Sequence, residues 1–150
     1  MEVTLEALKG LLEHKIGFVE RMGLKVLDLS PGHVKLMVPL ERNVNHVGGM
    51  YAGAMFTLAE IPGGALSLAT FDPSKYYPVV KELTIRFLKP AETDLTFEAS
   101  LAPEEVARLN SDLSSKSKAD FVIEGVIKDT SENVVAQTRA VYQVRALERR

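Results

Sequence analysis

One segment of the chain is apolar along nearly its whole length. From Val47 to Phe71 the only charged residue is Glu60. Such a segment is either a membrane span or a helix buried on nearly all sides inside a protein core. A carboxylate at the middle of a bilayer costs on the order of 2.5–3.5 kcal/mol, and Pro62 and five glycines also interrupt the segment. We therefore predict a core helix, kinked at Pro62.

The residues before this segment predict a helix and then a hairpin. Apolar residues recur at three- and four-residue spacing over residues 4–22, with charged residues between them, and Gly23 is suited to end this helix. Over residues 24–40 the period changes to two, and residues 30–32 (Ser-Pro-Gly) supply a turn. We expect one amphipathic helix over residues 4–22 and two short antiparallel strands after it.

After the apolar segment, the alternation of apolar and polar residues returns. Four half-buried strands are predicted, over residues 83–87, 95–101, 121–127 and 134–144. Short polar turns at residues 90–94 and 129–133 suit antiparallel neighbours. Residues 103–118 begin with Pro-Glu-Glu, which favours a helix start, and continue into four serines, so we expect a short helix followed by a loop.

One long apolar helix and about six strands, each with a single apolar face, can bury their apolar surfaces together in one simple arrangement. That arrangement is an α+β fold, in which a curved antiparallel sheet wraps around the helix. The 150 residues suffice for one sizeable core, and the sequence contains no repeat, linker or low-complexity tract. We expect a single domain over residues 1–150.

Composition and charge exclude several classes of function. The formal net charge is −2 and the basic residues are scattered, so we expect neither nucleic acid nor an anionic membrane as a partner. The chain has no cysteine, and His14, His33 and His46 lack the close spacing of metal ligands, so we expect no metal and no cofactor. Charged residues near the N-terminus leave no uninterrupted signal-peptide core, which indicates a cytoplasmic protein.

Glu60 is the sharpest candidate for chemistry, because a glutamate is almost never fully buried without a partner. Its helical neighbours at three, four and seven residues are mostly small: Gly53, Phe56, Thr57, Gly63 and Gly64. This stripe can approach a ligand or a second subunit closely. The structural alternative is a buried ion pair between Glu60 and Arg86 or Arg139.

The glycine-rich run over residues 43–53 leads into the apolar helix. Free backbone N–H groups of Ala52 and Gly53 at the helix N-terminus would hold a developing oxyanion, unless the run is an ordinary turn. Neither phosphate-loop pattern occurs, and the G-x-S-x-G elbow of serine hydrolases is also absent.

Residues 45–60 resemble the signature of hotdog-fold acyl-CoA thioesterases of the phenylacetate-pathway and 4-hydroxybenzoyl-CoA type. The matching residues are Asn45, Gly48, Gly53, Leu58, Ala59 and Glu60. Residues 83–91 are similar to a strand of that family that ends in a basic residue, proline and alanine. The resemblance implies hydrolysis of an acyl-CoA or related thioester, with Glu60 as nucleophile or general base and a backbone N–H at the helix start polarising the carbonyl. It also implies a site at a subunit interface, in a homodimer or a dimer of dimers.

Three residues depart from the signature and place the chain in a subgroup without the His-Gly-Gly motif. Tyr51 and Ala52 stand at the His-Gly positions, and His46 stands where proline is usual. The role of the family histidine then falls to the Tyr51 hydroxyl or is absent. Asn45 is expected to position the reacting group. Substrate contacts are expected from Gly48, Tyr51, Phe56, Thr57 and Arg86.

Two other functions fit the same fold. One is a module that binds acyl chains or acyl-CoA without turnover. The other is a hydroxyacyl-thioester dehydratase using His46 and Glu60, because the fourteen-residue spacing matches that class. The proline-glycine that dehydratases carry before the helix is missing.

Overall fold

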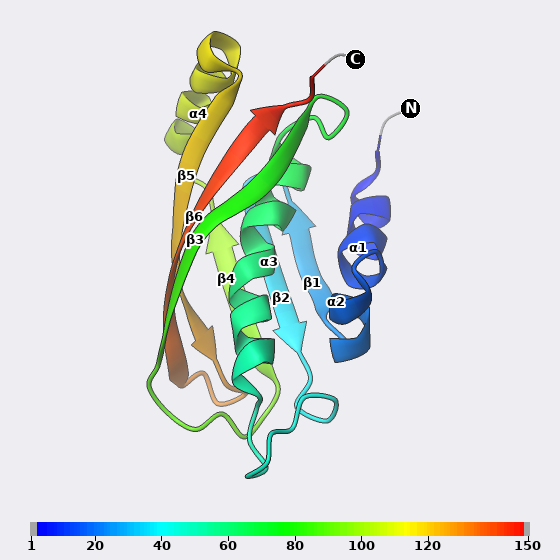
Figure 1. Ribbon diagram of the computed structural model, residues 1–150, viewed down its shortest axis with the longest axis vertical. Coiled ribbons are helices and arrows are strands. Elements are labelled where there is room, and N and C mark those ends of the chain that lie inside the picture. The colour runs from blue at the N-terminus through cyan, green and yellow to red at the C-terminus, as the bar shows by residue number, and fades with distance from the viewer. Residues whose placement is uncertain (1–2, 149–150) are drawn as a thin grey trace.

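The computed structural model describes residues 3–148 and shows one long helix enclosed by a curved antiparallel sheet (Figure 1). The elements in chain order are α1 (Leu5–His14), α2 (Gly17–Met22), β1 (Lys25–Ser30), β2 (His33–Val38), α3 (Ala52–Thr70), β3 (Tyr76–Phe87), β4 (Leu95–Ser100), α4 (Pro103–Lys116), β5 (Lys118–Lys128) and β6 (Val134–Ala146). The six strands lie in the order β1-β2-β4-β5-β6-β3, and every neighbouring pair is antiparallel. The predicted α+β architecture is confirmed.

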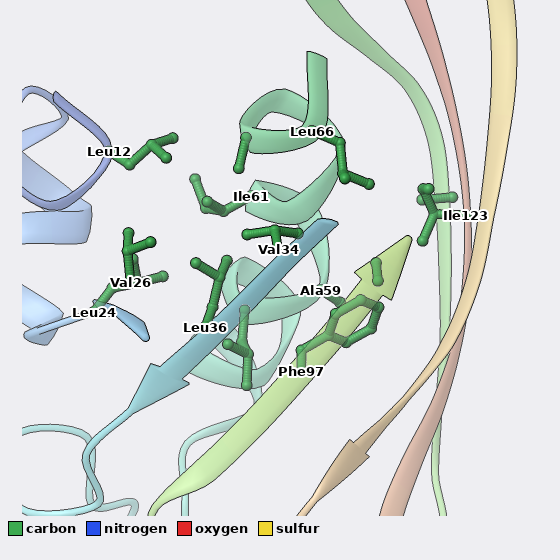
Figure 2. Packing of buried hydrophobic residues seen from close by; sticks show 14 of the residues in the cluster. Leu12, Leu24, Val26, Val34, Leu36, Ala59, Ile61, Leu66, Phe97 and Ile123 are labelled. Atoms are coloured by element: carbon green, nitrogen blue, oxygen red, sulfur yellow. The ribbon is translucent and has the colours of Figure 1, made fainter. Parts of the chain in front are cut away.

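The predicted core helix is α3, and ten of its nineteen residues are buried. Figure 2 shows Ala59 and Leu66 of α3 among side chains of β2, β4 and β5, such as Leu36 and Phe97. Gly125 of β5 makes room for this packing, because a Cβ atom there would lie 2.4 Å from the Phe97 ring. By length and composition α3 would also span a membrane, but it lies at the centre of the fold.

The predicted helix over residues 4–22 is two helices. Ile16 has extended backbone (φ −93°, ψ 112°) and separates α1 from α2. Glycines at positions 10 and 17 lower the helix propensity of this region. The break redirects the chain so that both helices bury apolar residues, among them Leu12 in α1 and Val19 in α2. Gly23 ends α2 at a φ of +75°, as predicted.

Strand β3 begins at Tyr76, well before the predicted residue 83, and none of its residues is buried. Pro78 conceals the first half of the strand in the sequence, because proline cannot donate to a sheet ladder. An edge strand tolerates it, and β3 is the edge strand next to β6. The ladder also shifts register between Val80 and Glu82. Leu83 and Ile85 are half-buried and pack against the core, as expected, whereas Phe87 at the end of β3 is 50% exposed.

The predicted short helix and loop over residues 103–118 form one continuous helix, α4, with β5 following almost at once. Leu109 and Leu113 are buried and anchor it to the sheet. The hydroxyls of Ser114 and Ser115 donate to the carbonyl oxygens four residues earlier, which keeps these serines within the helix.

Candidate functional site

One face of α3 is left uncovered by the rest of the described chain, residues 3–148. Its residues follow helical spacing and are half-buried or exposed: Gly53, Phe56, Thr57, Glu60, Gly64 and Leu68. This α3 stripe lies between β3 on one side and α1 on the other (Figure 1). Gly63 was predicted to belong to the stripe, but it is buried against the Tyr142 ring.

Glu60 lies on this stripe and lines a cavity of about 210 Å³ between α1, α3 and β3. Burial raises the pKa of the Glu60 carboxyl above the ordinary value of a glutamate. Within residues 3–148, no side chain forms an ion pair with it and no hydrogen bond reaches its carboxylate oxygens. A desolvated and unpaired carboxylate is the central chemical feature of the site.

The ion pair considered as an alternative does not form within the described chain. Arg139 pairs with Glu124, with Nε 3.5 Å from Oε1. Arg86 is exposed on β3, where Gln137 of β6 is its cross-strand partner. Both arginines alternate with the residues that face α3, so they lie on the outer face of the sheet. Arg86 is therefore not brought to the Glu60 cavity as predicted.

Tyr142 of β6 belongs to the site, although sequence analysis did not single it out as more than a strand residue. Its hydroxyl donates to the carbonyl oxygen of Glu60 at 2.8 Å and lies 3.2 Å from that of Ala59. Gly63 permits this approach, because a Cβ atom there would lie 2.1 Å from the Tyr142 ring. Burial and the nearby Glu60 carboxylate raise the pKa of Tyr142, so its hydroxyl stays neutral. Tyr142 thus holds the backbone that carries Glu60.

The loop before α3 is held together by Asn45. Its Oδ1 accepts hydrogen bonds from the backbone N–H groups of Val47 and Gly49, at 2.9 and 3.0 Å, and its Nδ2 donates to the Met50 carbonyl at 3.3 Å. Gly48 takes a φ of +91°, which a glycine adopts readily. Asn45 therefore holds this loop in place, and its contact with a substrate group stays a prediction.

The N-terminus of α3 presents unbonded amides, as the sequence predicts. Helix α3 begins at Ala52, and Tyr51 precedes it without capping the helix through its side chain. Among residues 3–148, neither the Ala52 amide nor the Gly53 amide donates to a backbone carbonyl, whereas the Ala54 amide donates to the Tyr51 carbonyl. These two N–H groups lie at the positive end of the helix dipole and are suited to an anionic oxygen.

The remaining predicted residues surround this end of α3. The side chains of Tyr51 and Phe56 are largely exposed, with 58% and 43% of each residue accessible to solvent. The Thr57 hydroxyl donates to the Gly53 carbonyl at 2.9 Å and is thereby occupied within the helix. His46 is exposed in the loop before α3. In the part of the chain that the structure describes, no cluster of His, Asp or Glu side chains is placed to hold a metal ion.

Comparisons with known proteins show the family to which this chain belongs. The model of a domain family of unknown function, DUF4442, matches residues 5–144. A crystal structure from Pseudomonas aeruginosa, described as a protein of unknown function and probable thioesterase, is 45% identical to this chain, with a TM-score of 0.91 and coverage of 98% of this chain and 99% of that one. A comparison with curated proteins found no match.

More distant structures share the fold. A thioesterase from Haemophilus influenzae is 17% identical, with a TM-score of 0.76, and the match covers 99% of this chain and 95% of that one. A mutant thioesterase from Staphylococcus aureus is 17% identical, with a TM-score of 0.71, and the match covers 87% of this chain and 99% of that one. The chain belongs to the DUF4442 family, which is part of the group of hotdog-fold thioesterases.

Proposed function

We propose that the protein hydrolyses an acyl-CoA or a related thioester, with Glu60 as the reacting carboxylate. The observation that carries the proposal is the state of Glu60, which lines an apolar cavity with a raised pKa and no partner among the described residues. Carboxylates perturbed in this way are typical of catalytic clefts. The similarity to the Pseudomonas aeruginosa protein supports the same class of reaction.

Glu60 has two ways to act on the thioester. As a nucleophile, its carboxylate oxygen bonds to the carbonyl carbon, the coenzyme A thiolate leaves, and water then cleaves the acyl anhydride. As a general base, it takes a proton from a water molecule that attacks the same carbon, and the thiolate leaves and is protonated. Both routes require ionised Glu60, and both place negative charge on the carbonyl oxygen.

The Ala52 and Gly53 amides are the donors that would stabilise this oxygen. Preorganised donors at the developing oxyanion are commonly worth about 10²–10³ in rate each. Tyr51 and Phe56 flank these amides with exposed aromatic surface that a bound thioester would cover. Asn45 contributes through the loop that places Tyr51 and the helix start.

Within one chain the carboxylate and the amides do not converge. Glu60 lies seven residues beyond Gly53, which is about 10 Å along the helix axis. Helical N–H groups also point toward the N-terminus, so an oxygen bound by these amides lies still farther from Glu60. We therefore propose a homodimer or a dimer of dimers, in which the amides of one subunit face the Glu60 carboxylate of the other.

The uncovered surfaces support this assembly. Among the described residues, edge strand β3 has no neighbour on its outer side, and Val80 and Phe87 on it are 43% and 50% exposed. The α3 stripe beside it has small residues at Gly53 and Gly64. A second copy would pair with the strand and cover the stripe, which removes an exposed edge.

The test is release of free thiol from a panel of acyl-CoA esters, with aliphatic chains of increasing length and aromatic acyl groups. Because the chain contains no cysteine, a thiol reagent reports coenzyme A alone. We expect hydrolysis of at least one ester by the wild type and a loss of about 10²-fold or more in Glu60→Gln. Equal rates in both proteins would refute a reacting role for Glu60.

Two further measurements distinguish the thioesterase from the two alternative functions, the binding module and the dehydratase. Ligands that raise the melting temperature of the protein without being cleaved would indicate a binding module. Hydration of an enoyl thioester that disappears in His46→Ala, without thioester cleavage, would indicate a dehydratase. The cytoplasmic location is part of the same proposal, and fractionation of expressing cells tests it.

A further inference from the structure

The cavity beside Glu60 is built almost entirely from aliphatic side chains. Its walls are Leu11, Leu12, Ile16, Glu60, Ile61, Gly64, Leu68, Pro78, Val79, Val80 and Tyr142. Figure 2 shows Leu12 of α1 on the side of α3 where Ile61 lies. The Tyr142 hydroxyl is turned into α3, where it donates to the Glu60 carbonyl. The Glu60 carboxylate is therefore the one polar side-chain group of the described walls that has no hydrogen-bond partner.

The cavity runs along α3 from Glu60 toward Leu68. Glu60, Gly64 and Leu68 follow one another at four-residue steps, so they lie on one side of the helix over about 12 Å. Ala52 and Gly53 lie in the opposite direction along the axis. A ligand whose carbonyl carbon meets Glu60 can thus extend an acyl chain toward Leu68, away from the helix N-terminus.

Gly64 keeps this path open. A Cβ atom built at Gly64 would have only the Pro78 side chain near it, at 3.9 Å, so the backbone does not require a glycine for packing. Adjacent Gly63 differs, because a Cβ atom there would overlap the Tyr142 ring. Glycine weakens a helix interior relative to alanine. Glycine at position 64 therefore lowers the stability of α3, and the space left by the missing side chain opens into the cavity.

We infer that this cavity binds the acyl chain of the substrate, that the chain is a medium-length aliphatic one, and that Gly64 limits its length. The inference rests on the proposed thioesterase function. A chain that lies along α3 from Glu60 to Leu68 spans about 12 Å, which suits an aliphatic chain of medium length. Polar acyl groups are disfavoured, because the aliphatic side chains that dominate the walls offer them no hydrogen-bond partner. Leu11 of α1 and Ile16, which lies between α1 and α2, are 44% and 52% exposed, and a bound chain would cover them.

The experiment compares kcat/KM for octanoyl-CoA and acetyl-CoA in the wild type, Gly64→Ala and Gly64→Leu. We expect the wild type to prefer octanoyl-CoA. The ratio of the two values should fall modestly in Gly64→Ala and by about 10- to 100-fold in Gly64→Leu, since one methylene changes such a ratio by about 10-fold or more. Gly10→Leu is the matched control, because its Cβ meets nothing within 4 Å and Gly10 does not line the cavity. Its ratio should equal that of the wild type.

A second measurement uses octyl-CoA, a thioether that cannot be hydrolysed, and free coenzyme A as the reference. Octyl-CoA should raise the melting temperature of the wild type and of Gly10→Leu more than free coenzyme A does, and this difference should disappear in Gly64→Leu. Circular dichroism of each variant without ligand establishes that it is folded.

The outcomes separate the inference from the proposed function. If Glu60-dependent hydrolysis occurs but Gly64→Leu keeps the wild-type ratio, or if aromatic esters are preferred to every aliphatic one, the cavity assignment is wrong and the thioesterase proposal stands. If no ester is cleaved but octyl-CoA stabilises the wild type and not Gly64→Leu, the cavity assignment stands without the hydrolase. If octyl-CoA acts no differently from coenzyme A on all proteins, the cavity assignment is wrong.

Discussion

The Glu60 side chain combines two properties that oppose each other. Burial disfavours its ionised form, and no cation among residues 3–148 compensates for that cost. The same desolvation makes an ionised carboxylate more reactive toward a carbonyl carbon than it would be in water. The residue is therefore unfavourable for the fold and useful for the reaction, a combination typical of active sites.

The pH dependence of hydrolysis follows from this residue. The reacting form is ionised, so kcat/KM should fall as pH is lowered through the pKa of Glu60 in the free enzyme. Because burial raises that pKa, the midpoint should lie above about 4.3, the value of an unperturbed glutamate. A pH–rate profile measures this midpoint, and a midpoint at or below the unperturbed value would contradict the desolvated state of Glu60.

The same burial should make Glu60→Gln more stable than the wild type. In the wild type, a raised pKa means that the folded state binds the proton more tightly than the unfolded state, so ionised Glu60 destabilises the fold at neutral pH. We expect Glu60→Gln to be more stable at pH 7 by about 1 kcal/mol, or roughly 2–4 °C in Tm.

The difference in stability between Glu60→Gln and the wild type should shrink as pH falls through the raised pKa of Glu60 in the folded state toward its ordinary pKa in the unfolded state. Below both values the carboxyl is protonated in the folded and in the unfolded protein. Thermal melts of the two proteins at several pH values measure this difference, and other carboxyl groups cancel because both proteins share them. A sharp loss of stability in Glu60→Gln at pH 7 would instead indicate a structural partner for the carboxylate.

At the residue scale, the sequence was sufficient to identify Glu60 but not its surroundings. A lone carboxylate in a long apolar segment is visible without any structure. Tyr142 lies 82 residues from Glu60, and no local pattern distinguishes its hydroxyl contact from those of other strand residues. The need for a glycine at Gly63 follows only from that contact, which explains why Gly63 was misplaced on the uncovered stripe.

At the scale of elements, the segment that joins β2 to α3 is fixed from several sides. The Tyr51 amide donates to the Asn43 carbonyl, and the Asn43 side chain donates to the carbonyls of Met22 and Pro39, each at 2.8 Å. The Met50 amide donates to the Ala91 carbonyl at 2.7 Å. The start of α3 is thereby placed by backbone contacts that side-chain changes at Tyr51 and Ala52 leave intact.

Asn45 provides the test of this element. Asn45→Ala removes both hydrogen bonds accepted by Oδ1 and the one donated by Nδ2, so we expect a loss of about 1–2 kcal/mol in stability and a lower kcat/KM. Asn45→Asp retains both acceptor bonds and should restore most of each quantity. Chemical denaturation and steady-state kinetics measure the two effects. Failure of Asn45→Asp to recover activity would indicate direct contact between the Asn45 amide and the substrate.

Helices and strands can be predicted from the sequence wherever the pattern of apolar residues reflects burial against one core. The alternation in β4, β5 and β6 and the uniform apolarity of α3 each report burial against one core, and these elements lie where predicted. The break at Ile16 and the early start of β3 at Tyr76 lack such a signal. In both places the hydrophobic period does not mark the boundary, and tertiary packing determines where each element begins or ends.

At the scale of the whole molecule, the described chain leaves related surfaces incomplete. Edge strand β3 lacks an outer neighbour, the α3 stripe lacks a cover, and the Ala52 and Gly53 amides point away from Glu60. One second copy related by two-fold symmetry would satisfy all of them, because each chain would supply the same surface to the other. A shared site makes a prediction that a site within one chain does not.

The prediction uses two inactive variants. Ala52→Pro removes one amide donor at a position where proline is favoured, and Tyr51 already has the extended backbone (φ −61°, ψ 133°) that precedes a proline. We expect it to fold and to lose about 10²-fold or more in kcat. Glu60→Gln removes the carboxylate. In a mixed dimer with a shared site, one site carries both substitutions and the other carries neither.

Co-expressed in equal amounts, the two variants should form mixed dimers in about half of the population, so the mixture should recover about a quarter of the wild-type activity. Native mass spectrometry counts the mixed dimers, and each variant expressed alone is the control. Within a single chain, no mixing can join an intact amide to an intact carboxylate. Mixed dimers without recovered activity would therefore place the whole reaction in one subunit, and a monomeric mass would remove the shared site altogether.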